Sequence, residues 1–476
     1  MENGAYYGID FGTTNTSVYL YNYEKGIGKR ETGFGTDGKD IQPFSSCIAI
    51  SKTNQNDFKY GREVKEHIND LAGQYKIITS FKSLLGTGEE ITVNGTRYNG
   101  KKLAAMFLNH VKETVQKIRP DFKNAVLSIP VDFSPEARTD LLEAAKTVGI
   151  NVKGFVSEST AAYISKVMEI KAYSKVMVID FGGGTLDLSI LDLKQNRVYE
   201  DAVYGMKFGG DDIDRELALR LMPKIYPNTS FEDLDSKRKD KLMNEIEQMK
   251  INFSHYDDHT ITLGEGTKPV EIDYDTFSDI ITPSITRNVV DAISKVMQKA
   301  NVSPENIDKV ILAGGSSGLR PFAEIINSCF EPEKIIFDDQ YQWMVAKGAA
   351  ITSAVNCEFR LADDICILLS DGETYPVLMK DENKVGDESE HLSFSLTTDA
   401  TDAHFIFTDS TGKNRYCTFS VKTKGFLNEM LELTVAIGMD QIARVTVTNG
   451  HMGSGYCVKK NINKLRFYYD LKDIEE

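Results

Sequence analysis

Hydrophobic and polar positions change their period several times within the first 360 residues, and the changes predict alternating strands and helices. Residues 6–22 form two strand-like runs around Gly12-Thr13-Thr14, and residues 175–193 repeat that order around a second glycine turn. Residues 125–130 and 310–313 are short apolar runs of the kind that form buried strands. The alternation predicts an α/β fold for this part of the chain.

Two further segments have the period of amphipathic helices. Residues 134–149 carry apolar side chains at helical spacing, with Ser134 as the expected N-cap and Pro135 in the first turn. Residues 277–300 have the same period, and Pro283 predicts a break within them.

Beyond residue 359 helical periodicity gives way to short alternating runs. Turn-forming residues separate six of them, at 376–380, 391–396, 404–408, 415–421, 430–437 and 441–448. Closely spaced short strands predict a β-sandwich. We therefore expect a first domain at residues 1–360 and a β domain at residues 371–476.

The composition is that of an ordinary globular protein with an acidic balance. The 476 residues include 55 Lys and Arg against 70 Asp and Glu, a net charge of −15. This charge disfavours nucleic-acid binding, because phosphate backbones are repelled. No apolar run reaches the roughly 18 residues that a membrane span needs, and the first ten residues lack the features of a secretory signal, so a cytoplasmic protein is expected.

The cysteines and histidines do not favour a metal site. The six cysteines are scattered without a C-x-x-C pair and are expected to be reduced thiols. His255 and His259 are four residues apart and could share a helix face as metal ligands. However, Asp257 and Asp258 between them favour a polar turn.

An internal repeat carries most of the functional information. A shift of 170 residues, the separation of Asp10 and Asp180, places Ile9-Asp10-Phe11-Gly12 on Ile179-Asp180-Phe181-Gly182. The flanking strands match as well. Each copy is an apolar strand, an Asp, a glycine-containing turn and an alternating strand. Two such hairpins would bring two backbone-lined turns together across a cleft.

The chemistry of the two turns points to phosphate. Their glycines let backbone N–H groups approach an anion closely, and Thr13, Thr14 and Thr185 add hydroxyl donors. Asp10 and Asp180 repel phosphate, so they require a cation between them, and Mg²⁺ held through water is the usual solution. Two ordinary hairpins would also contain turn glycines, but the matched flanks of both copies favour a phosphate site.

Three other glycine-rich segments have different interpretations. Gly314-Gly315-Ser316 follows a predicted strand and precedes a helix, where an α/β fold binds the nucleoside end of a ligand, although a plain turn would look the same. The G-x-G-x-x-G match at residues 33–38 lacks the flanking strand and helix of a dinucleotide site. The near match to a P-loop at residues 95–101 is better explained by a hairpin turn at Asn94-Gly95.

These motifs resemble those of the actin/hexokinase-type ATPases, and more specifically the DnaK-type, seventy-kilodalton heat-shock chaperones. The two phosphate motifs and the adenosine motif of that family correspond to residues 8–14, 178–187 and 311–316. Further matching segments lie at 129–133, 157–162, 208–214 and 347–350, in the family's order. The resemblance implies a two-lobed actin-like ATPase built from duplicated ribonuclease-H-like halves, followed by a C-terminal β-sandwich that binds peptides. It also implies an interdomain linker at residues 361–370.

The resemblance also implies roles for individual residues. Asp10 and Asp180 would organise Mg²⁺. The catalytic set would be Lys82, which stabilises charge on the γ-phosphoryl oxygens, with Thr185 and the water-orienting Glu158 and Asp187. Pro130 and Arg138 would couple the domains. ATP or ADP would be held by Gly12, Thr13, Thr14, Gly182, Gly183, Gly184, Thr185, Gly210, Glu247, Lys250, Ser254, Gly314, Gly315 and Ser316.

The chain departs from the family pattern at several positions. Ile251 and Gly318 stand where the family has arginines near the adenine, so nucleotide affinity is expected to differ, with Arg320 as a candidate to reach back. Gly154 replaces an arginine linked to J-domain co-chaperones, which weakens the expectation of that partner. The sequence ends without the family's helical lid, so rapid client exchange is expected.

The resemblance implies a chaperone with weak intrinsic ATPase activity whose partners are extended, unfolded polypeptides and a nucleotide exchange factor. Two alternatives remain open. A small-molecule kinase on the same core would hydrolyse ATP faster with a sugar or a carboxylic acid present. A nucleotide-sensing adaptor would bind one fixed partner rather than many apolar peptides, and filament formation in ATP would indicate an actin-like polymer.

Overall fold

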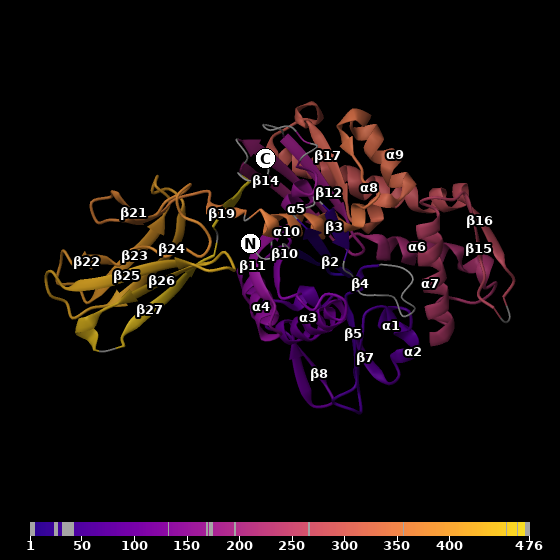
Figure 1. Ribbon diagram of the computed structural model, residues 1–476, viewed down its shortest axis with the longest axis horizontal. Coiled ribbons are helices and arrows are strands. Elements are labelled where there is room, and N and C mark those ends of the chain that lie inside the picture. The colour runs from indigo at the N-terminus through magenta and orange to yellow at the C-terminus, as the bar shows by residue number, and fades with distance from the viewer. Residues whose placement is uncertain are drawn as a thin grey trace. The chain divides into compact units, whose positions relative to one another are not determined.

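The computed structural model describes residues 5–22, 27–30, 42–131, 133–167, 170, 175–194, 197–264, 267–355, 357–453, 455–463 and 465–471 (Figure 1). The chain divides into two compact units. The first comprises Met1–Val152, Val156–Gln195 and Glu200–Val355, and the second comprises Lys153–Phe155, Asn196–Tyr199 and Asn356–Glu476.

Two sheets of the first unit carry the internal repeat. In the first sheet, β1 (Ala5–Phe11) pairs antiparallel with β2 (Asn15–Asn22) and parallel with β10 (Asn124–Ile129). In the second sheet, β12 (Lys175–Phe181) pairs antiparallel with β13 (Leu186–Lys194) and parallel with β17 (Lys309–Ala313). Strands β1 and β12 are therefore related by the predicted shift of 170 residues, and each half joins a hairpin to one parallel strand.

The other strands of the first unit extend these sheets or form small ones. The first sheet also contains β11 (Asn151–Ser157), β3 (Ile27–Arg30) and β4 (Phe44–Ser45), and the second also contains β18 (Ile335–Ile336) and β14 (Arg197–Met206). The small sheets are β5 (Cys47–Ser51) with β6 (Phe58–Tyr60) and β7 (Tyr75–Thr79), β8 (Glu90–Val93) with β9 (Thr96–Asn99), and β15 (Asp258–Ile261) with β16 (Val270–Asp273).

Helices surround the sheets, and the two helices predicted from the sequence are present. They are α4 (Pro135–Thr147), whose N-cap Ser134 accepts a hydrogen bond from the Ala137 N–H, and α8 (Tyr274–Ala300). The others are α1 (Arg62–Lys65), α2 (Ile68–Leu71), α3 (Gly100–Gln116), α5 (Glu158–Ile164), α6 (Gly210–Ile225), α7 (Ser236–Asn252), α9 (Arg320–Cys329) and α10 (Met344–Ala354).

The break predicted at Pro283 is wrong, because α8 runs through it as one 27-residue helix. Pro283 removes one backbone donor, but Ile281, Ile285 and Val289 on either side are fully buried in the core. Packing of that apolar face keeps the helix continuous.

Two glycines set how closely α10 approaches its neighbours. A side chain at Gly8 in β1 would place its Cβ 2.2 Å from the carbonyl oxygen of Ala346, and one at Gly348 would lie 1.7 Å from that of Ala161 in α5. Only glycine permits these backbone contacts. They hold α10 against the strand that carries Asp10.

The hairpin interpretation of Asn94-Gly95 is confirmed. Both residues have positive φ angles, 47° and 74°, and they join the antiparallel strands β8 and β9. The G-x-G-x-x-G match at residues 33–38 lies outside the described residues.

The second unit contains two four-stranded antiparallel sheets that share one hydrophobic core (orange to yellow in Figure 1). One has the order β21 (Thr374–Leu378), β20 (Ile365–Leu368), β23 (Asp402–Thr408), β24 (Arg415–Lys422). The other has the order β22 (Leu392–Ser395), β25 (Met430–Ile437), β26 (Ala443–Thr448), β27 (Cys457–Ile462). Six of these strands coincide with the six predicted runs to within two residues.

The linker expected at residues 361–370 is not a separate linker in this structure. Residues 365–368 form β20, which pairs with β21 and β23, and Ile365, Cys366 and Ile367 are buried. A short apolar run between acidic residues fits a buried strand as well as an exposed linker, and the core of the second unit decides between them.

The second unit also contains β19 (Glu358–Leu361), which pairs with β28 (Phe467–Asp470). A side chain at Gly154 would meet the Phe359 ring at 2.6 Å. An arginine therefore does not fit at position 154 in this arrangement, which gives the departure from the family pattern a steric reason.

Two chemical expectations can be compared with the structure directly. All six cysteines are free thiols, as predicted. Within the described part of the chain, no helix has the length and apolar composition needed to cross a membrane.

Candidate functional site

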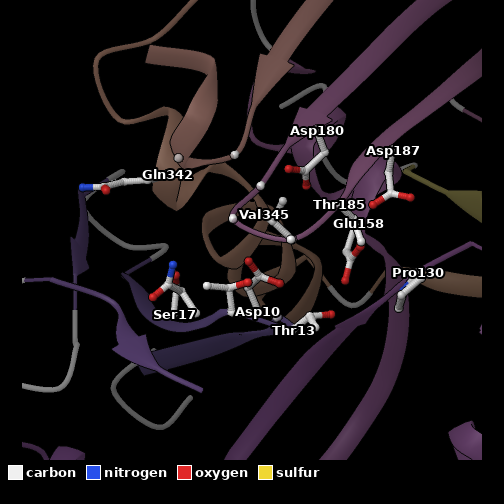
Figure 2. A pocket seen from close by; sticks show the side chains of 18 of the residues that line it. Asp10, Thr13, Ser17, Pro130, Glu158, Asp180, Thr185, Asp187, Gln342 and Val345 are labelled. Carbon is white, nitrogen blue, oxygen red and sulfur yellow. The ribbon is translucent and has the colours of Figure 1, made fainter. Parts of the chain in front are cut away.

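A cavity of about 380 Å³ in the first unit is lined by both repeated turns (Figure 2). The predicted residues that line it are Asp10, Gly12, Thr13, Thr14, Lys82, Pro130, Glu158, Asp180, Gly182, Gly183, Gly184, Thr185, Asp187, Gly314 and Gly315. They come from six separate segments of the sequence. The fold thus brings together most of the residues that the motifs singled out.

The two turns contact each other at the cavity. A Cβ at Gly183 would lie 2.7 Å from the Thr14 side chain, and the backbone N–H of Gly182 donates to the Thr185 carbonyl at 3.0 Å. A Cβ at Gly12 would lie 2.2 Å from the Asn15 carbonyl oxygen. Glycine is therefore needed at position 12 for the tight first turn and at position 183 for the close approach of the two turns.

Two carboxylates reach the cavity from the ends of the equivalent strands β1 and β12. Figure 2 shows Asp10, Asp180 and Glu158 directed into the same space. The Ser128 hydroxyl on β10 donates to Asp10 at 2.7 Å, which fixes that carboxylate. Asp187 faces Asp180 across the β12–β13 pair and lines the cavity as well.

The pKa values of these carboxyl groups reflect their crowding. Burial raises the pKa of Asp10 to about 6, the Glu158 charge adds to the effect, and Lys82 opposes it. Burial also raises the pKa of Asp180 well above its usual range, and the charges of Glu158, Asp10 and Asp187 reinforce this. So many acids around one cavity favour a bound cation.

Lys82 lies where the carboxylates converge. Its ammonium nitrogen is 2.8 Å from Glu158, and only 5% of its side chain is exposed. The lysine belongs to the 3-10 turn Phe81–Leu84, directly after β7. A buried cation at this position can stabilise negative charge that develops on a ligand in the cavity.

The donor set fits Mg²⁺ held largely through water. Among the described residues, no group of three or more His, Cys, Asp or Glu side chains is arranged to hold a metal ion directly. Asp10 and Asp180 supply two carboxylates in one cavity, and Mg²⁺ usually keeps several waters and binds one or two carboxylates together with substrate phosphates.

The histidine pair takes no part in such a site. His259 contacts Asn252 and Glu245, whereas His255 lies in an exposed turn after α7. The interpretation of residues 257–258 as a turn is only half right, because Asp258 begins β15.

Part of the predicted adenosine set lies beside the cavity rather than on its wall. The Ser316 hydroxyl and the Gly210 N–H both donate to the Gly182 carbonyl, at 2.8 and 3.1 Å. Lys250 donates to the Gly210 carbonyl at 3.0 Å and to Asp214 at 2.7 Å. These contacts join the second glycine turn to the start of α6 and to α7.

Two other members of that set lie apart from these contacts. Glu247 lines a second cavity, of about 300 Å³, where it accepts a hydrogen bond from Lys65 at 2.7 Å. Ser254 is half-buried just beyond the end of α7. Arg138 is buried on α4, away from the cavity lining, whereas Pro130 lines the cavity at the end of β10.

Several residues of the cavity wall were not predicted. They are Asn15, Ser17, Pro43, Gly205, Met206, Lys207, Tyr341, Gln342 and Val345. The repeat contained a signal for one of them, because Ser17 lies 170 residues before Asp187 and faces Asp10 as Asp187 faces Asp180. The segments at 205–207 and 341–345 belong to no motif, and only the fold brings them to the site.

Comparison with known proteins agrees with this geometry. The family model described as Hsp70 protein matches residues 57–385, which is more than half of the chain. A curated relative, the "Chaperone protein DnaK" of Mycoplasma mobile, is 27% identical over 368 residues, covering 73% of this chain and 58% of the relative. The chain thus spans less than two thirds of the length of that relative. With the duplicated hairpins and their shared acidic cavity, the match shows that the chain belongs to the Hsp70 family of the actin-like ATPase superfamily.

Proposed function

We propose that this chain is a DnaK-like chaperone, in which binding and hydrolysis of Mg-ATP in the first unit control the binding of extended apolar peptides by the second. The observation that carries the proposal is the convergence of Asp10 and Asp180, from equivalent strands of a duplicated fold, on one cavity that also contains Lys82. Family membership supports the same reading.

The cavity residues have distinct tasks in this proposal. The backbone of the two glycine turns, with Thr13, Thr14 and Thr185, binds the phosphates. Asp10 and Asp180 hold Mg²⁺ through water, and bound Mg²⁺ would neutralise charge on the phosphate oxygens. Phosphoryl transfer requires mainly positioning and charge stabilisation, and the buried side chains meet that requirement.

Glu158, Asp187 and Lys82 act at the end of the cavity near Pro130. Glu158 and Asp187 orient the attacking water, while Lys82 stabilises the charge that develops on the transferred group. The hydrogen bond between Lys82 and Glu158 holds both side chains in place before the nucleotide binds. Weak intrinsic hydrolysis is also part of the proposal.

The second unit is proposed as a β-sandwich peptide-binding domain. Its edge strands β21 and β22 bring together Tyr375 and Phe394, whose rings meet edge-on with centroids 5.6 Å apart, and 40% of the Tyr375 side chain is exposed. An extended peptide can pair with a free strand edge while apolar side chains occupy neighbouring contacts. Pro130 and Arg138 are proposed to couple this event to the nucleotide, and unfolded polypeptide in the cytoplasm is the proposed substrate.

Isothermal titration with ATP and ADP, with and without Mg²⁺, tests the nucleotide part of the proposal. Binding of both nucleotides that tightens with Mg²⁺ is expected, and in Asp10→Asn or Asp180→Asn the Mg²⁺ effect should be lost. Absence of nucleotide binding by the unmodified chain would contradict the proposal.

A peptide array tests the chaperone part. Binding to many apolar extended peptides supports the chaperone. Capture of a single partner would instead support an adaptor, and acceleration of hydrolysis by a sugar or a carboxylic acid would support a kinase. A J-domain protein and a nucleotide exchange factor are further proposed partners, and stimulation of hydrolysis by the first is expected to be weak because position 154 is glycine.

A further inference from the structure

We propose that Tyr341 forms the wall on which the nucleobase stacks, in place of the arginines found elsewhere in the family. This inference rests on the proposed function, because it concerns the base end of the same nucleotide site. Among the described residues that line the cavity, Tyr341 supplies the one aromatic ring.

The position of Tyr341 relative to the charged groups suits a base. Figure 2 shows Gln342, its neighbour in the sequence, at one end of the cavity and Pro130 at the other, with Asp10 and Glu158 between them. Glu158, with the Lys82 ammonium nitrogen 2.8 Å from it, thus lies toward the Pro130 end. Gly314 and Gly315 line the cavity together with Tyr341, so this part of the wall combines glycine backbone with an aromatic face, and Asp180 is the charged group next to Gly314.

Tyr341 is held in place from two sides. The Gly314 N–H donates to the Tyr341 carbonyl at 3.3 Å, which ties the ring to the turn after β17. The ring itself stacks on Phe337 with centroids 5.2 Å apart and an interplanar angle of 21°. A ring fixed in this way loses little conformational freedom when a ligand stacks on it.

Gly318 leaves the space that the Tyr341 ring fills. A Cβ at Gly318 would lie 2.3 Å from the Tyr341 hydroxyl oxygen and 2.6 Å from Cζ. A larger residue at position 318 would displace the Tyr341 ring. The position of the ring therefore depends on glycine at position 318.

The other candidates for a base contact are occupied or exposed. Arg320, which was expected to reach back, donates to the Phe253 carbonyl at 2.7 Å and to Asp257 at 2.7 Å. Its guanidinium also lies 3.6 Å from the centroid of the Tyr274 ring. Ile251 is 48% exposed and offers no charge. These contacts leave Tyr341 as the flat surface for the base.

Calorimetry with two ligands separates the base from the phosphates. For Tyr341→Ala, we expect the affinity for Mg-ADP to fall by about tenfold, the scale of one lost base–aromatic stack. The affinity for Mg²⁺ with inorganic tripolyphosphate should stay within twofold, which also shows that the variant is folded. Tyr341→Phe should match the unmodified chain, since the hydroxyl points at Gly318.

Two further variants test the geometry. Tyr341→Leu retains apolar bulk without a π face and should still lose most of the ADP affinity. Gly318→Ala as a single substitution should weaken ADP binding. Combined with Tyr341→Ala it should have no further effect, because it acts by displacing the Tyr341 ring.

The possible failures are distinguishable. Absence of ADP binding by the unmodified chain overturns the proposed function and this inference with it. Binding by the unmodified chain together with unchanged ADP affinity in both Tyr341→Ala and Tyr341→Leu overturns this inference alone. An equal loss of ADP and tripolyphosphate affinity also overturns it, because Tyr341 would then support the phosphate site rather than the base.

Discussion

The Lys82 ammonium group donates a hydrogen bond to the Glu158 carboxylate at 2.8 Å, and both side chains are largely shielded from water. The pair joins the 3-10 turn after β7 to the start of α5 and lies at the end of the cavity where transfer is proposed. A lysine in this environment can stabilise developing charge more strongly than an exposed one.

Replacement of Lys82 by methionine should therefore lower the rate of ATP hydrolysis by about 10²- to 10³-fold, the effect of removing one preorganised charge donor. Nucleotide binding should fall much less. Single-turnover hydrolysis and ADP titration measure the two effects. Lys101→Met is the matched control, because Lys101 pairs with Glu143 at 2.6 Å on the surface of the same unit. Equal rates of ATP hydrolysis in Lys82→Met and Lys101→Met would show that Lys82 has no role in the reaction.

One face of α7 holds the segment α1–α2. Asp240 accepts hydrogen bonds from the backbone N–H groups of Asn69 and Asp70, both at 2.7 Å. One turn further along, Asn244 donates to the Glu66 carbonyl at 2.7 Å, and Glu247 pairs with Lys65. The second cavity lies between these elements, next to Thr13 and Thr14.

Asp240→Ala should accelerate ADP dissociation at least fivefold. The substitution removes the acceptor of two backbone N–H groups. An unsatisfied donor of this kind costs on the order of 1–3 kcal/mol, and the loss favours separation of α1–α2 from α7. Stopped-flow release of a fluorescent ADP analogue measures the rate. Lys237→Ala on the exposed side of the same helix is the control and should leave release unchanged. If ADP dissociates from Asp240→Ala no faster than from the unmodified chain, the contact does not limit release.

Gly8→Ala should destabilise the first unit. The new Cβ would meet backbone atoms of α10 at 2.2 and 2.3 Å, and overpacking of this kind costs about 1–3 kcal/mol. The single tryptophan, Trp343, is fully buried in the cluster that contains Ala346 and Ala350, so its fluorescence during urea unfolding reports on this contact. Gly73→Ala, where nothing lies within 4 Å, should change stability by less than about 0.5 kcal/mol.

Glu429 should make the second unit sensitive to acid. Burial would raise its pKa, but the Lys424 N–H, the Asn449 amide and the Gly425 N–H hold it below the usual 4.5. A carboxylate whose pKa is lowered by folding contributes stability above its unfolded pKa and loses that contribution as the pH falls through the folded value. The loss is therefore expected below about pH 4.5.

Hydrogen exchange of residues 422–430 tests this expectation. Glu429→Gln should raise the exchange rate at pH 7 and should show a smaller further loss of protection on acidification than the unmodified chain, after correction for intrinsic rates. An identical pH dependence in both proteins would contradict the assignment. Glu432→Gln, on the neighbouring strand, should behave like the unmodified chain.

Tyr375→Asp should weaken the binding of an apolar peptide by about tenfold or more, because it places a charge at the exposed aromatic edge. Fluorescence anisotropy of a labelled peptide measures the affinity. Leu427→Asp is the control, since Leu427 is 61% exposed in a loop elsewhere in the same unit. If Leu427→Asp weakens binding and Tyr375→Asp does not, the peptide site is not at the β21–β22 edge.

The sequence predicts the parts of the site that repeat or that obey local rules. The Asp10 and Asp180 hairpins, the Ser134 N-cap and the Asn94-Gly95 turn depend on neighbouring residues, and each is present. The error at Pro283 has a non-local cause, because tertiary packing of the buried face of α8 outweighs the loss of one hydrogen bond.

Contacts between distant segments could not be predicted in this way. Asp240 and Asn69 are 171 positions apart, and neither belongs to a motif. Tyr341 reaches the cavity only because α10 and the turn before it pack against β1 and β17. The strand β20 was missed because its four apolar residues fit a linker equally well until its partners β21 and β23 are known.

The register of the two hairpins has a consequence for how the protein acquired its asymmetry. Equivalent positions hold a hydroxyl in one copy, Ser17, and a carboxylate in the other, Asp187. Two identical halves would accept a phosphate chain in either of two opposite directions. A carboxylate on one side and a hydroxyl on the other removes that equivalence, so the bound chain would have one preferred polarity.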